Sequence, residues 1–230
     1  QNPAGLLTTP LLTLPAKQQT RPVGSVTSVP RTARGEPGAP LTGRVDAYAP
    51  VRLQRVQRPE ERQLFRELVG RYHYLSYRVP FGAHLQYLVS ISTPVPTTVG
   101  CVQFSSAAWR MRARDAWIGW DDNTRARRLS FVTNNHRFLI LPWVRVPHLA
   151  SHILGRISRR LSDDWQTKYG HPVYLLETFV ERERFKGTCY RAANWTCVGQ
   201  TKGRSRQDRY STLRVPIKDI YLYPLTSSPR

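Results

Sequence analysis

The segment between residues 135 and 204 constrains the fold most, because apolar runs and helical patterns alternate along it. An apolar strand is expected over residues 138–144, and a basic amphipathic helix is expected over 148–165. A second apolar strand is expected over 173–180, and a small-residue helix over 187–194 precedes a last strand and a basic tail. On such an α/β frame, polar side chains at the ends of elements are where sites usually lie.

The sequence before and after this segment adds elements of the same kind. Pro59 followed by two glutamates is typical of a helix N-terminus, because acidic side chains suit the positive end of the helix dipole. Residues 85–91 and 99–104 have the pattern of a β-hairpin, and residues 217–225 have that of a final strand. An exposed helix is expected to start at Asp121. This order predicts an α/β domain with a mixed sheet and flanking helices.

Composition divides the chain into three parts. Residues 1–50 are rich in Pro, Thr, Gly and Ala, and we expect a disordered or extended tail there because few aromatic side chains are present. Residues 51–225 form the expected single α/β domain, and residues 226–230 are expected to fray. We find neither an apolar run long enough to cross a bilayer nor a basic leader before an apolar core, so we expect a cytoplasmic protein.

The strongest compositional signal is the net charge of +20, with an isoelectric point of about 10.9. So large an excess predicts a polyanionic partner, as in ribosomal, membrane-surface and DNA-binding proteins. Most of the basic residues are arginines, whose guanidinium groups pair with phosphates and guanine edges. Six tryptophans and eleven tyrosines can stack on bases. We therefore expect contact with nucleic acid, with DNA first and RNA as the other choice, and no membrane partner.

The basic residues cluster in two regions, one over residues 110–128 and one in the flexible run over 202–209. Arginines in the two helices of the central segment add to them, and all of these side chains are suited to phosphate contact. The candidate nucleic-acid-binding residues are Arg110, Arg112, Arg114, Arg125, Arg127, Arg128, Arg156, Arg159, Arg191, Lys202, Arg204, Arg206 and Arg209.

Four polar residues form the candidate catalytic or base-contacting group. Glu177 lies in the second apolar strand, where apolar neighbours would raise its pKa and suit a general base; it can equally pair with a buried arginine. Asn135 and Asn194 match the edge of adenine, or they satisfy backbone groups at a bulge and at a helix end. Tyr190 can be an acid or a stacking platform, or it can pack in the core.

No metal or redox site is predicted. Cys101, Cys189 and Cys197 form no C-x-x-C pair, so they are expected to be free thiols in a reducing compartment. His148 and His152 share a helix face, but no nearby Glu or Cys completes a set of metal ligands. The sequence leaves the identity of any cofactor open.

A series of sequence blocks carries a family resemblance. They are GRYHYLSYRVPFGAHLQYLV, RDAWIGW, NHRFLILPWVRVPHLASHILGRISRRLSDDW, LLETFV, FKGTCYRAANW, VGQTKGR and IYLYPL. In this order, over roughly residues 58–225, they resemble the Druantia protein A-like family, which occurs in the Druantia anti-phage system and in proteins of bacterial insertion sequences. The resemblance implies a bacterial protein of phage defence or of a mobile genetic element.

The order hairpin, strand, helix, strand, helix, strand also resembles the GNAT acyltransferase fold. In that fold, the pyrophosphate of acyl-CoA binds backbone N–H groups at the start of the central helix, beside a Gly-rich loop. The corresponding residues 144–152 contain a proline but no pair of glycines, so the close backbone approach is missing. We therefore expect that this chain does not use acetyl-CoA.

The first functional hypothesis is a DNA-binding protein of anti-phage defence or of a mobile element, which can have partners among the proteins of those systems. Its arginines would hold phosphates, and Asn135, Glu177, Tyr190 and Asn194 would face a base or a strand end. An alternative is a GNAT-like enzyme that modifies or processes a nucleobase or DNA end. A second alternative is an RNA- or ribosome-associated basic protein.

Overall fold

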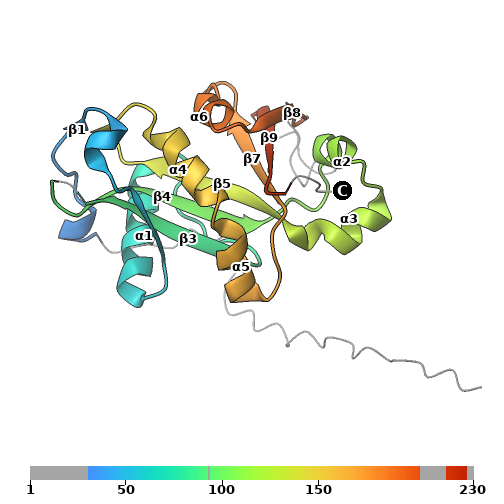
Figure 1. Ribbon diagram of the computed structural model, residues 1–230, viewed down its shortest axis with the longest axis horizontal. Coiled ribbons are helices and arrows are strands. Elements are labelled where there is room, and N and C mark those ends of the chain that lie inside the picture. Colours follow the sequence, from blue (N-terminus) through green and yellow to red (C-terminus); the bar gives the residue numbers. More distant parts are fainter. Residues whose placement is uncertain (1–30, 93, 203–215, 227–230) are drawn as a thin grey trace, which may run out of the picture.

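A seven-stranded sheet forms the centre of the computed structural model, which describes residues 31–92, 94–202 and 216–226 (Figure 1). In sheet order, its strands are β2 (Arg52–Arg55), β3 (His84–Ile91), β4 (Thr97–Ser106), β5 (Val132–Ile140), β7 (Leu175–Glu181), β9 (Lys218–Pro224) and β8 (Thr196–Gln200). β5 and β7 run parallel, and the other neighbouring strands run antiparallel. The predicted mixed sheet is confirmed.

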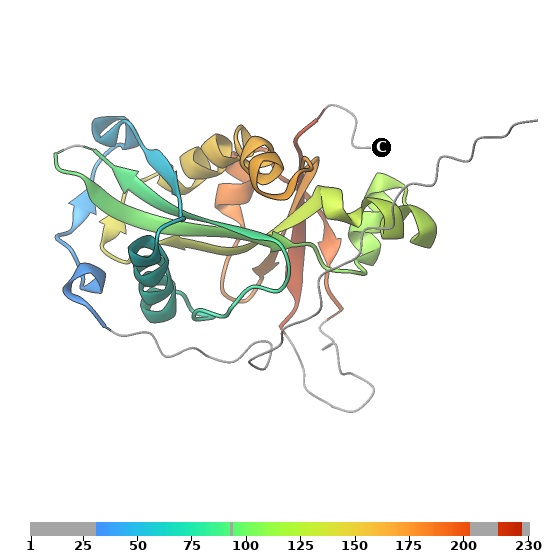
Figure 2. The same cartoon turned by 90° about the horizontal axis from the view of Figure 1, so that it is seen from below.

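Helices cover both faces of this sheet. Helix α1 lies on one face, and helices α4 and α5 lie on the other (Figure 2). Helices α2 and α3 lie at one end of the molecule, where α2 contacts β8 and β9 (Figure 1). The helices are α1 (Pro59–Tyr72), α2 (Arg112–Ile118), α3 (Asp122–Arg128), α4 (Leu149–Ser158), α5 (Leu161–Tyr169) and α6 (Thr188–Ala192). No helix in the described ranges is long and apolar enough to cross a membrane.

The helix predicted to begin at Pro59 and the predicted hairpin, β3 and β4, are both present. At the start of α1, the Glu61 carboxylate accepts hydrogen bonds from the backbone N–H groups of Gln57 (2.8 Å) and Arg58 (3.1 Å). The bond from Gln57 contributes most to lowering the pKa of Glu61 from 4.5 to about 2, and burial opposes it. These bonds satisfy backbone donors that a helix leaves unpaired at its N-terminus. The predicted apolar stripe of α1 is buried, at Leu64, Phe65, Leu68 and Val69.

The basic helix predicted over residues 148–165 is in fact two helices, α4 and α5. Arg160 leaves helical geometry (φ −126°), and its guanidinium donates to the Leu53 carbonyl (2.7 Å) and to the Asp164 carboxylate (2.8 Å). Leu53 lies in β2, far away in the sequence, so periodicity along the helix could not reveal this break. Both segments still bury their apolar faces, at Ile153, Leu154, Ile157, Leu161 and Trp165.

Residues 31–50, expected as part of an extended tail, pack against the domain instead. The short strand β1 (Leu41–Thr42) pairs in parallel with β6 (Val144–Arg145), and Leu41 packs against the core. Thr32 donates two hydrogen bonds of 2.7 Å to the buried carboxylate of Glu67 on α1, one from its backbone and one from its hydroxyl. The expectation was wrong because the strand pairing with β6 and the hydrogen bonds to Glu67 hold a segment that has too few aromatic side chains to form a core of its own. Residues 1–30 and 227–230 lie outside the described residues.

Candidate nucleic-acid interface and cleft

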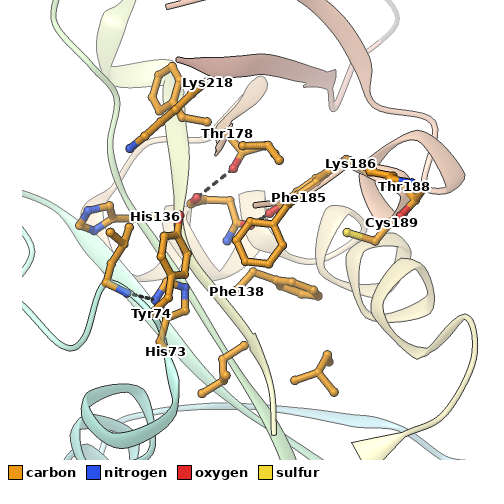
Figure 3. A pocket seen from close by; sticks show the side chains of 18 of the residues that line it. His73, Tyr74, His136, Phe138, Thr178, Phe185, Lys186, Thr188, Cys189 and Lys218 are labelled. Atoms are coloured by element: carbon orange, nitrogen blue, oxygen red, sulfur yellow. Dashed lines mark hydrogen bonds between the residues drawn. The ribbon is translucent and has the colours of Figure 1, made fainter. Parts of the chain in front are cut away.

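A cleft opens where the two parallel strands of the sheet separate. β5 and β7 pair from Val132, opposite Leu175, to Asn134, opposite Glu177, and both strands continue unpaired with each other beyond that point. The space between them holds a cavity of about 530 Å³, a size typical of ligand sites. The two strands, the turn after α1 and the segment that leads into α6 line this cleft (Figure 3).

Aromatic rings make up much of the cleft lining, together with imidazoles, amides and hydroxyls. The rings belong to Tyr72, Tyr74, Phe138, Phe185 and Tyr190. Lys186 and Lys218 add two positive charges, and no Asp or Glu is among the described residues that line the cavity. Because flat rings and cations lie together without a carboxylate, the cleft suits a ligand that has both a planar part and a negative charge.

Asn135 and Tyr190, two of the predicted site residues, meet at the wall of this cleft. The Tyr190 hydroxyl donates to Asn135 Oδ1 (2.8 Å), and the Thr178 hydroxyl donates to the Asn135 carbonyl (3.1 Å) (Figure 3). Asn135 Nδ2 in turn donates to the carbonyls of Gln103 (3.1 Å) and Arg137 (3.2 Å). Burial raises the pKa of Tyr190, so its phenol stays protonated and acts as a fixed donor.

Two histidines of the lining are neutral at physiological pH. Burial, with the charge of Arg137 as the second cause, lowers the pKa of both His73 and His136 to about 4. Gln86 Nε2 donates to Gln103 Oε1 (2.8 Å), which leaves the Gln103 amide nitrogen to donate to His136 Nδ1 (3.2 Å). This chain of amides places the proton of the neutral His136 ring on Nε2.

Glu177 lies outside the cleft, contrary to its predicted place in a shared pocket. It is fully buried on the other side of β7, where it accepts from Arg114 Nη1 (2.9 Å) and from the Ala108 backbone N–H (2.9 Å). Burial raises the pKa of Glu177 and Arg114 opposes the rise. Since successive side chains of a strand point to opposite faces, Thr178 occupies the cleft and Glu177 does not. The alternative of a carboxylate paired with a buried arginine is therefore the correct one.

Two predicted phosphate ligands, Arg114 and Arg125, are inside the protein. Arg114 has no exposed surface and donates to Asp115 Oδ1 from both Nε (2.9 Å) and Nη2 (2.8 Å). Arg125 is 4% exposed and pairs with Asp115 (3.3 Å) and Asp122 (2.8 Å). These ion pairs join α2 and α3 to β7, so both predictions are wrong: the guanidinium groups are already occupied and cannot reach a phosphate.

The remaining candidates on α2, α3 and α4 are exposed. Arg112, Arg127 and Arg128 form what we call the α2–α3 arginines. Arg156 lies on α4 and Arg159 directly follows it, and α4 lies away from α2 and α3 (Figure 1). No ion pair among the described residues involves the α2–α3 arginines. The other exposed candidates are Arg110, which pairs with Asp122, Arg191, which donates to the Tyr221 hydroxyl, and Lys202. Arg204, Arg206 and Arg209 lie outside the described residues.

Asn194 does not join Asn135 and Tyr190. It is exposed, has a left-handed backbone (φ 63°) just after α6, and is absent from the cleft lining, so it fits the alternative of a residue that ends a helix. His148 likewise has a left-handed backbone (φ 64°) before α4. Within the described ranges, no three His, Cys, Asp or Glu side chains are grouped closely enough to hold a metal ion.

Comparison with known families identifies the family of this chain. The family model described as Druantia protein DruA matches residues 11–228. This chain belongs to the DruA family. No curated protein matches it.

Solved structures similar to this DruA-family chain include acetyltransferases. Spermidine N-acetyltransferase from Vibrio cholerae in complex with CoA and spermine is 10% identical, with a TM-score of 0.48, and covers 78% of this chain and 98% of its own. Spermidine/spermine N-acetyltransferase from the same organism in complex with manganese ions is 11% identical, with a TM-score of 0.46, and covers 76% of this chain and 92% of its own. At this identity their substrates and cofactors are not carried over to the DruA-family chain.

Sequence reasoning missed much of the cleft of this DruA-family chain. His73, Tyr74, Phe185, Lys186 and Lys218 come from two loops and a strand that are far apart in sequence. The family resemblance was the one sequence signal for them, because its blocks over residues 70–89 and 185–195 contain four of these five residues. No local pattern could have shown that the two blocks meet across the cleft.

Proposed function

We propose that this DruA-family chain is a DNA-binding protein of bacterial anti-phage defence or of a mobile genetic element. Family membership supports the biological setting, and the net charge of +20 supports a polyanionic partner. The observation that carries the proposal is the cleft between β5 and β7, whose described lining has rings, amides and lysines but no carboxylate. These are the groups that stack on bases and attract phosphates.

The α2–α3 arginines are the proposed contacts to the phosphate backbone. All three are exposed, and the acidic neighbours Asp115 and Asp122 are already paired with Arg110, Arg114 and Arg125. Within the described part of the protein the α2–α3 arginines form no ion pair, and the charge of Asp121 at the start of α3 acts on Arg127 without forming one. The cleft would receive a base or a strand end from the bound DNA, with Asn135 and Tyr190 at its wall.

A salt titration of duplex DNA binding tests this proposal. Counterion release makes the logarithm of the binding constant fall linearly with the logarithm of salt concentration, by about 0.9 per phosphate contact. Replacing the three α2–α3 arginines by alanine should lower the slope by roughly three in total and weaken binding to all sequences alike. The matched control is Arg44→Ala, since Arg44 is exposed but lies in the N-terminal segment and pairs with Asp46.

Three outcomes would contradict the proposal. Binding that does not depend on salt would exclude phosphate contacts as its source. A triple variant with the wild-type slope would move the contacts away from α2 and α3. Tighter binding of RNA than of DNA, measured by competition between duplexes of matched length and sequence, would favour the alternative of an RNA-associated protein.

An enzyme that acts on a nucleobase or a DNA end is the second candidate, and the Tyr190–Asn135 pair favours it. The 2.8 Å hydrogen bond fixes both side chains at the wall of a ligand-sized cleft, as the groups that position a substrate in an active site are fixed. The test is the intact mass of DNA after incubation with the protein, with and without added cofactors. A mass change that Tyr190→Phe abolishes would support the enzyme, and DNA that is bound but unchanged in mass under all of these conditions would count against it.

A further inference from the structure

Two aromatic rings meet across the mouth of the cleft. Tyr74, in the turn after α1, and Phe185, in the loop before α6, have their ring centroids 5.2 Å apart at an interplanar angle of 60° (Figure 3). Both rings are partly open to solvent, with 38% of Tyr74 and 45% of Phe185 exposed. Exposed apolar side chains that gather beside a cavity, rather than being scattered singly, often mark a ligand or partner site. We call this contact the Tyr74–Phe185 bridge.

The Tyr74 side of the bridge is held rigidly. The His73 ring stacks on Tyr74 with centroids 4.9 Å apart and planes 28° from parallel. The Leu75 backbone N–H donates to His73 Nδ1 (3.2 Å), and the buried Arg137 donates from Nε to the Ser76 carbonyl (3.0 Å). These contacts hold the turn in place, with His73 covering one face of the Tyr74 ring.

The Phe185 side carries the positive charge. The Arg184 guanidinium lies over the Tyr74 ring, with its central carbon 4.9 Å from the ring centroid, and its Nε is 3.6 Å from Glu181 Oε1. Lys186 lines the cavity. Two hydrogen bonds to the Glu181 carbonyl anchor this loop at the end of β7, from the backbone N–H groups of Arg184 (3.2 Å) and Phe185 (2.8 Å). A flat cation, a ring and a second cation therefore follow one another along three consecutive residues.

We propose that the Tyr74–Phe185 bridge is a clamp for an unpaired nucleotide, an inference that rests on the DNA-binding function proposed above. The base would stack on the exposed Phe185 ring and on the Tyr74 face that Arg184 covers, and the Arg184 side chain would move from that face to the phosphates, which Lys186 and Lys218 would also face. The ligand has to be unpaired because each base inside a duplex is covered on both faces by its neighbours. A cavity of about 530 Å³ also holds one nucleotide rather than a stretch of duplex.

The chemistry of the lining sets this ligand apart from other planar molecules. His73 and His136 are neutral and supply hydrogen bonds without charge, whereas Lys186 and Lys218 supply positive charge, which matches a ligand with an uncharged base and a charged phosphate. Stacking tolerates every base, because every base has a π-face. The clamp therefore selects unpaired over paired nucleotides and makes no strong choice of sequence.

The experiment compares three DNAs of one sequence: a fully paired duplex, the same duplex with a single bulged 2-aminopurine, and the same duplex with a 2-aminopurine in a short single-stranded tail. Dissociation constants come from fluorescence anisotropy, and 2-aminopurine emission reports stacking. We expect wild-type protein to bind the bulged or tailed DNA roughly five- to a hundredfold tighter than the paired duplex, and to quench the emission. Tyr74→Ala and Phe185→Ala should each remove most of this preference, while Tyr74→Phe should keep it.

Phe81→Ala is the matched control, because Phe81 is an exposed ring (68%) that does not line the cleft, and it should leave the preference unchanged. Circular dichroism and the melting temperature show whether each variant is folded. If an alanine variant is not folded, the comparison of the three DNAs with wild-type protein still tests the proposal. Salt-dependent binding of all three DNAs with equal affinity would overturn the clamp and leave the DNA-binding function standing. Loss of the preference in Phe81→Ala as well as in Tyr74→Ala would also overturn it. No binding to any of the DNAs would refute both.

Discussion

Glu177→Gln is the substitution that best separates a structural carboxylate from a catalytic one in this protein. Glu177 and Arg114 are both fully buried and joined by a 2.9 Å ion pair, and Glu177 also accepts from the Ala108 backbone N–H. A glutamine has one acceptor oxygen, so its amide N–H₂ must face either Arg114 or the Ala108 N–H, and two donors then oppose each other. The substitution also removes one of the two carboxylates that neutralise Arg114.

The size of the effect follows from these contacts. Leaving one partner of a buried ion pair uncompensated costs about 3–5 kcal/mol. Asp115 still pairs with Arg114 at 2.8 Å, so part of the guanidinium charge stays balanced. We therefore expect Glu177→Gln to lower the free energy of unfolding by about 2–4 kcal/mol, a large share of the roughly 5–15 kcal/mol that a domain has in total.

Urea denaturation followed by tryptophan fluorescence measures this change as a shift of the midpoint at constant slope. The matched control is Glu183→Gln, because Glu183 is exposed in the loop after β7 and should change the stability by less than about 0.5 kcal/mol. The reasoning is refuted if Glu177→Gln is as stable as Glu183→Gln, since the buried pair would then contribute nothing. It is refuted more strongly if a stable Glu177→Gln loses a DNA-dependent activity.

Three further substitutions test other parts of the structure. The pKa of Glu61 is lowered in the folded protein from 4.5 to about 2. Its ionised carboxylate should therefore contribute about 1–3 kcal/mol to stability above pH 4.5, and this contribution should be lost as the pH falls toward 2. The stability difference between wild type and Glu61→Gln, followed by acid titration, should shrink over that range. Tyr190→Phe leaves Asn135 Oδ1 without its donor and should cost about 1–2 kcal/mol in urea denaturation, and an unchanged midpoint would mean that this hydrogen bond does not form. Gly187→Ala should cost about 1–3 kcal/mol by the same measurement, because Gly187 has a φ of 65° and an added Cβ would collide with the Tyr221 hydroxyl; no loss would show that α6 begins differently.

The sequence predicted the elements of the fold better than their ends. The hairpin and α1 could be predicted because alternation and the Pro59 start signal are local. The division of residues 148–165 into α4 and α5 could not, because Arg160 is held by the Leu53 carbonyl of a distant strand. The packing of residues 31–50 was missed for the same reason, since their partners lie on α1 and β6.

Prediction of the site succeeded in part. Asn135 and Tyr190 were chosen from the sequence and do meet, at the wall of the cleft. Glu177 and Arg114 were chosen for different roles and instead neutralise each other inside the protein. A charged residue in a sequence does not show whether its partner is a phosphate or a buried counter-charge, because the choice depends on which other chain segment packs against it.

The sequence by itself determined that this is an α/β protein with a large positive charge and a DruA-type arrangement of motifs. Those properties depend on composition and on patterns within about ten residues of each other. The tertiary structure alone decided that β5 and β7 separate after Asn134, and that Tyr74 and Phe185 meet over the opening. The physical reason is that a cleft is made by segments distant in sequence, and their separation is set by packing across the sheet rather than by any local preference.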